Sequence, residues 1–127
     1  MLREFAQILG IALVLFGLAG LALGEQYAAG LVKVHLGADL LHLISGLALA
    51  GVGIAWGTAG LVRQTVTGTG VLYVLVGVLG FFAPALFGLV PEAFTVVDNL
   101  IHLAIGALAL LGAWLSARRP ATQTLGG

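Results

Sequence analysis

Two histidines stand at the same place in two similar segments, DLLHLISG and NLIHLAIG. The first segment holds Asp39 and His42, and the second holds Asn99 and His102. Residues three apart share a helix face, so each oxygen-bearing side chain can touch its histidine, fix the imidazole tautomer or cap the helix. Paired imidazoles on two helices suit three roles: hydrogen bonding between helices, ligation of a haem or another metal-centred pigment, and passage of protons.

Small residues follow each histidine on the same helix face, beginning with Gly46 and Gly106. The stripe continues as Ala50, Gly53 and Gly57 in one segment and as Ala109 and Ala113 in the other. Small residues let another helix backbone approach closely, so the histidine faces are expected to point at protein rather than lipid. We therefore favour structural polar pairs, His42 with Asp39 and His102 with Asn99, and expect no cofactor or metal. A haem or chlorophyll-like pigment held by both histidines is the alternative.

Other patterns that carry chemistry are missing from the sequence. It has no cysteine and no phosphate-binding GK[ST] loop, and its few carboxylates are expected at helix ends rather than as an acid–base pair. Ser45 and Ser116 have no adjacent base pattern, and His35 beside Lys33 is interpreted as a solvated loop residue. Five basic residues balance five acidic ones, which does not favour a nucleic-acid partner. The sequence predicts a protein that is not an enzyme.

The elements that must position the histidines are membrane spans. Apolar residues make up 61% of the chain and charged residues only 8%, too few to cover a soluble domain. Charges separate four apolar runs, each near the roughly 20 residues that a helix needs to cross the hydrocarbon core. Pro84 is expected to end the third helix near Phe82. The expected spans are 5–24, 39–59, 67–84 and 98–117.

Basic residues predict the orientation of these spans. Arg3, Arg63, Arg118 and Arg119 fall on one side of the four-span map, and only Lys33 falls on the other. The positive-inside rule then predicts a multi-pass protein of the plasma (inner) membrane with both termini in the cytoplasm. Trp56 and Trp114 lie near the same side, where aromatic residues favour the membrane interface.

The sequence matches itself at an offset of 60 residues without a gap. The matched pairs include Arg3 with Arg63, Gly10 with Gly70, Gly17 with Gly77, Gly20 with Gly80, His42 with His102 and Gly46 with Gly106. The first helix thus corresponds to the third, which favours a retained span over a signal peptide. The fold class predicted is all-α: one transmembrane domain, 1–127, forming an antiparallel four-helix bundle of two tandem two-helix repeats, 3–60 and 63–120.

Because each repeat has two spans, both copies enter the membrane from the same side, and matched positions lie at matching depth. In an up-down bundle the second and fourth helices lie on opposite corners. His42 and His102 should therefore face each other across the bundle axis. A gap between them would admit a flat metal-centred ring, whereas direct contact, which we favour, would leave them bonding to each other, to their neighbours or to water.

The segment GVLYVLVGVLGFFAPALFGLV, followed by NLIHLAIG, resembles an uncharacterised family of small four-span bacterial membrane proteins with an N-L-x-H-L-x-x-G motif. The first repeat departs from this motif, because Asp39 stands where the family has asparagine. The resemblance implies a membrane location and four spans but no activity. We expect a structural or accessory component that contacts the lipid bilayer, as a homo-oligomer or in a larger membrane complex. A small channel or transporter is a further alternative.

Overall fold

The computed structural model describes the chain except for residues 25, 29–31, 35, 84, 89–93 and 119–127. Its long helices are α1 (Leu2–Leu23), α2 (Leu36–Gly51), α3 (Ala59–Phe82) and α4 (Val96–Arg118). Its short elements are the strands β1 (Gln26–Ala28) and β2 (Val32–Val34), the π-helix η1 (Val52–Trp56) and the 3₁₀-helix η2 (Leu86–Gly88). The helical segments Leu2–Leu23, Leu36–Ala55, Ala59–Phe82 and Val96–Arg118 are each long and apolar enough to cross a membrane.

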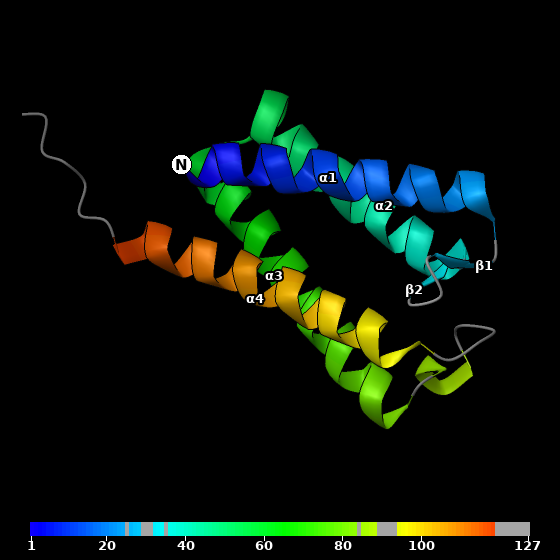
Figure 1. Ribbon diagram of the computed structural model, residues 1–127. Helices are drawn as coiled ribbons and strands as arrows, with labels where there is room; N and C mark the ends of the chain where they lie inside the picture. The colour runs from blue at the N-terminus through cyan, green and yellow to red at the C-terminus, as the bar shows by residue number, and fades with distance from the viewer. Residues whose placement is uncertain (25, 29–31, 35, 84, 89–93, 119–127) are drawn as a thin grey trace, which may run out of the picture.

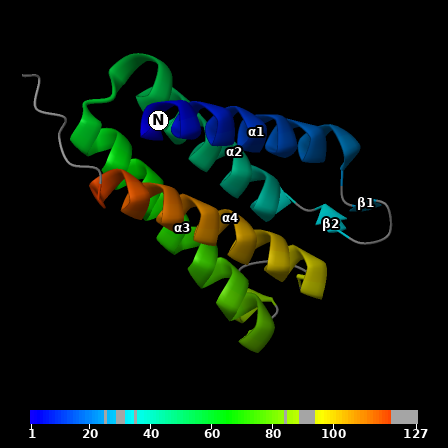
Figure 2. The ribbon, with the colours of Figure 1, turned by 60° about the vertical axis from the view of Figure 1, so that its left-hand side comes forward.

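The helices form two antiparallel hairpins that join into one bundle (Figures 1 and 2). Within each repeat the packing is closest, with α1 along α2 and α3 along α4. The N-terminus, the α2–α3 connection and the end of α4 lie at one end of the bundle, and β1, β2 and η2 lie at the other. The predicted architecture, an all-α bundle of two tandem two-helix repeats, is confirmed.

Glycine brings the two helices of each repeat into backbone contact. A Cβ atom at Gly46 of α2 would lie 2.7 Å from the backbone nitrogen of Val14 in α1, and a Cβ atom at Gly106 of α4 would lie 2.7 Å from that of Val74 in α3. Both residues of the second contact stand 60 positions after those of the first. The sequence repeat is therefore also a repeat of contacts, and each seam needs a residue without a side chain.

Two signals fix the ends of α3. Thr58 is its N-cap, and the threonine hydroxyl accepts a hydrogen bond of 3.2 Å from the backbone nitrogen of Leu61. The helix ends at Phe82, the position expected from Pro84 two residues later. Because α3 begins at Ala59, it covers more residues than the expected span 67–84.

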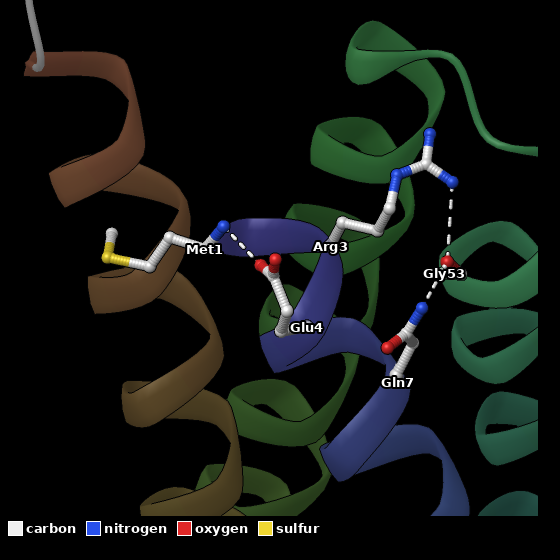
Figure 3. Close-up of polar contacts among 5 residues, drawn as sticks. All are labelled: Met1, Arg3, Glu4, Gln7 and Gly53. Atoms are coloured by element: carbon white, nitrogen blue, oxygen red, sulfur yellow. Dashed lines mark hydrogen bonds and ion pairs between the residues drawn. The ribbon is translucent and has the colours of Figure 1, made fainter.

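The π-helix η1 directly follows α2, and side chains of α1 bond its Gly53 carbonyl (Figure 3). Gly53 accepts hydrogen bonds from Gln7 Nε2 at 2.7 Å and from Arg3 Nη1 at 3.3 Å, and Arg3 Nη2 also donates to the Gly57 carbonyl. A π-turn breaks the regular i to i−4 ladder, so carbonyl groups near a helix end need other donors. Arg3 and Gln7 supply them and tie the two helices together at this end.

The connection between α1 and α2 carries a short antiparallel β-ribbon. Its strands pair antiparallel, with Tyr27 opposite Lys33, and α2 begins directly afterwards at Leu36. A short ribbon is allowed here because this connection lies beyond the end of the spanning helix α1, where water can satisfy the strand edges. The ribbon lies outside the bundle, so the predicted all-α bundle is unaffected by it.

Candidate functional site

The structure brings His42 and His102 into direct contact inside the bundle. Their ring centroids lie 5.5 Å apart and the ring planes differ by 12°, so the rings stack. Each side chain is only 3% exposed. The sequence repeat predicts that the two histidines lie at equal depth and face each other, and the stacked rings agree with this. Each histidine also follows the first residue of its helix by the same six positions.

A third ring, Tyr73 of α3, completes this contact. Its centroid lies 5.9 Å from that of His42 and 5.6 Å from that of His102, and its side chain is 0% exposed. Phe16 of α1 meets His42 edge to face at 4.9 Å, and Phe94, just before α4, lies 5.4 Å from His102. Each of the four long helices thus contributes one ring to a single cluster, Phe16, His42, Tyr73 and His102, which we call the ring cluster.

The polar atom of Tyr73 is satisfied inside the cluster. Its hydroxyl lies 2.9 Å from Ser45 Oγ, and Ser45 in turn donates to the backbone carbonyl of Leu41 at 2.6 Å. With its own hydrogen donated to that carbonyl, Ser45 Oγ accepts from the tyrosine hydroxyl. This bond joins α2 of the first repeat to α3 of the second.

The beginning of α4 sets the tautomer of His102. Thr95 and Asp98 form a reciprocal cap: Thr95 N and Oγ1 each donate to Asp98 Oδ2 at 2.8 Å, and Asp98 N donates to Thr95 Oγ1 at 3.1 Å. The Asp98 carbonyl oxygen lies 2.6 Å from His102 Nδ1. Because a carbonyl oxygen only accepts, Nδ1 carries the proton in this bond. The cap therefore orients the imidazole through the backbone.

The oxygen-bearing side chains at 39 and 99 lie against glycines of the neighbouring helix. A Cβ atom at Gly20 would overlap the Asp39 carboxylate, and a Cβ atom at Gly80 would overlap the Asn99 carboxamide. Asn99 Oδ1 accepts no hydrogen bond within the described part of the chain, and His102 Nδ1 donates to the Asp98 carbonyl instead of to Asn99. Both side chains are buried, as the prediction of protein-facing motifs requires.

Tyr73, Asp98 and the role of Ser45 were not predicted from the sequence. The sequence did contain a signal for Tyr73. This residue lies three positions after Gly70 and four before Gly77, which places it on the helix face that carries these glycines. Ser45 lies three residues after His42 and so shares its face. His35 and Arg119 lie outside the described residues.

The stacking of the two imidazoles limits which ligands His42 and His102 can bind together. In bis-histidine ligation a metal lies between two imidazole nitrogens, with the macrocycle between the rings. Here the imidazoles stack on each other, and Tyr73 touches both. A macrocycle could enter only by separating these three rings. No group of three or more His, Cys, Asp or Glu side chains that could hold a metal ion occurs in the described residues.

Comparison with known proteins adds no assignment. No protein-family model matches the chain, and no curated protein or solved structure matches it significantly.

Proposed function

We propose that the chain is a structural or accessory component of a bacterial inner membrane rather than an enzyme. The ring cluster carries this proposal, because it uses both intramembrane histidines to join helices of the two repeats. Asp98 is engaged in capping α4, and Glu4 pairs with the amino group of Met1, so neither carboxylate is placed for acid–base chemistry. The resemblance of NLIHLAIG to small four-span bacterial proteins supports the location.

Large apolar side chains on the outside of the bundle support a partner in the membrane. Several are more than half exposed, among them Ile8, Leu15, Ile44 and Leu108. Lipid accommodates such surfaces, and so does a second protein. We infer a homo-oligomer or a larger membrane complex as the assembled form, with no nucleic-acid partner.

The test of this role is an absorption spectrum combined with a native mass. We expect protein purified in mild detergent, after expression with ample haem, to show no Soret band and a native mass above the 12.9 kDa of one chain. A Soret band that disappears in His42→Ala and His102→Ala would support the pigment alternative instead. Ion or proton flux in proteoliposomes that is lost in the same variants would support a channel or transporter.

The orientation is part of the proposal and has its own test. The absence of cysteine allows single-cysteine variants to be labelled selectively. We expect an impermeant maleimide to label Leu36→Cys in cells with an intact inner membrane, and Ala59→Cys only after that membrane is permeabilised. Both positions are exposed and lie at opposite ends of the bundle, so each is the control for the other. The reverse pattern would show that the termini face outward.

A further inference from the structure

A partly open hollow of about 440 Å³ lies at the end of the bundle that carries the N-terminus. Arg3 of α1 and Arg63 of α3 both line it, together with Ser116 of α4 and the first residues of α3, Ala59 and Gly60. None of its described lining residues is acidic. Two arginine side chains and several hydrogen-bond donors therefore line one hollow, in a chain that has few charged residues.

The two arginines are matched by the sequence repeat but have different surroundings. Arg3 uses its guanidinium to bond the carbonyl groups of Gly53 and Gly57 at the π-helix. In the second repeat the matching carbonyl groups would be those of Ala113 and Ala117, which lie within α4, where no π-turn occurs. Arg63 has no hydrogen-bond or ion-pair partner among the described residues. Its five N–H donors are available to a ligand.

The beginning of α3 adds backbone donors to the same hollow. Thr58 caps the backbone nitrogen of Leu61, and the first ladder bond runs from Val62 N to the Thr58 carbonyl. The amide groups of Ala59 and Gly60 precede that bond and have no acceptor within the helix. Such first-turn amides, with the positive end of the helix dipole, favour an anion.

The local charges leave the hollow positive. Glu4, the acidic residue closest in sequence to Arg3, is turned to the amino group of Met1, whereas Arg3 extends towards Gly53 (Figure 3). The Arg63 guanidinium and the two free amides, next to the positive charge of Arg3, suit a phosphate, whose oxygen atoms accept paired hydrogen bonds from arginine. The ligand chemistry that fits is therefore a phosphate ester.

The position of the hollow favours a lipid headgroup as the source of the phosphate. It lies at one end of four helices that can cross a bilayer, which is the depth of lipid headgroups. Leu2 and Val62 supply apolar lining, and the neighbouring Leu61 and Leu115 are exposed, as contact with an acyl chain requires. We propose that this hollow binds the phosphate headgroup of an anionic phospholipid, with Arg63 as its main ligand.

The test compares two arginine variants of the full chain in detergent. Arg63→Gln removes one of the two charges that line the hollow. Arg118→Gln removes one charge at the same end of the bundle, but Arg118 does not line the hollow; its guanidinium stacks on Trp114, 3.8 Å from the ring centroid. Both residues are exposed, so neither change should prevent folding. Native mass spectrometry with added phosphatidylglycerol or phosphatidylcholine measures the lipid that each variant retains.

We expect the unaltered protein to retain phosphatidylglycerol in preference to phosphatidylcholine, and Arg63→Gln to weaken that binding about tenfold, as the loss of a charge-assisted hydrogen bond does. Arg118→Gln should bind as the unaltered protein does. Equal weakening by both variants would show a diffuse effect of charge and overturn the proposal. Displacement of the lipid by millimolar inorganic phosphate would also overturn it, since it would identify free phosphate as the ligand.

Discussion

Alanine at Gly46 or Gly106 is expected to destabilise the bundle by about 2 kcal/mol in each case, because the added methyl group has no room. Its Cβ would lie 2.8 Å from a backbone carbonyl oxygen of the facing helix at both positions, that of Gly10 for Gly46 and that of Gly70 for Gly106. Backbone atoms cannot rotate away as a side chain can, so the helices themselves must separate. The two variants should lose similar amounts, because the repeat gives them equivalent contacts.

The measurement is reversible unfolding by sodium dodecyl sulfate in mixed micelles. Gly68→Ala is the matched control: this glycine lies in α3, and a Cβ atom there meets nothing within 4 Å. It should leave the free energy of unfolding unchanged or raise it by up to about 1 kcal/mol, since alanine favours the helix. If Gly46→Ala unfolds like Gly68→Ala, the helices do not pack through this glycine.

The parts of the fold that could be predicted from sequence depend on short-range patterns and on the repeat. Charged residues marked the ends of apolar runs, because a charge inside the hydrocarbon core is costly. The offset of 60 residues then placed His42 and His102 at equal depth before any contact was known. Neither inference needed the identity of a distant partner, which is why both could be made from the sequence alone.

The π-helix could not be predicted, because its stabilising partners are remote in sequence. Arg3 and Gln7 bond the Gly53 carbonyl from about fifty residues away. At the sequence level Arg3 served as a charge for the positive-inside rule and as the match of Arg63 in the repeat. Its role at the π-helix depends on how α1 lies along α2, which hydrophobicity alone does not specify.

The partners of the histidine motifs illustrate a different limit. Residues three apart share a face, and the side chains of Asn99 and His102 are both buried in the bundle. The spacing could not decide which neighbour each side chain would bond. The Thr95–Asp98 cap presents the Asp98 carbonyl to His102, and Asn99 is turned to Gly80. The pattern Thr-x-x-Asp before an apolar run was visible, but its effect on His102 passes through a backbone group.

Tyr73→Ala is expected to have the largest effect, a loss of about 3 kcal/mol or more in the free energy of unfolding. The ring is fully buried and contacts His42 of the first repeat and His102 of its own. Its removal leaves a cavity where the repeats join, and the Ser45 hydroxyl loses its partner from α3. The matching residue of the first repeat, Leu13, cannot compensate, because its side chain carries no group that could bond Ser45.

Tyr73→Phe separates the ring from its hydroxyl. It keeps the ring contacts and removes only the hydrogen bond to Ser45, which in a membrane bundle contributes about 0.6 kcal/mol. The same detergent titration should therefore rank the unaltered protein above Tyr73→Phe and both far above Tyr73→Ala. If the two substitutions cost the same, the hydroxyl carries the stabilisation and the stacked rings carry little of it. If neither costs anything, the ring cluster does not hold the two repeats together, and the observation behind the structural role is lost.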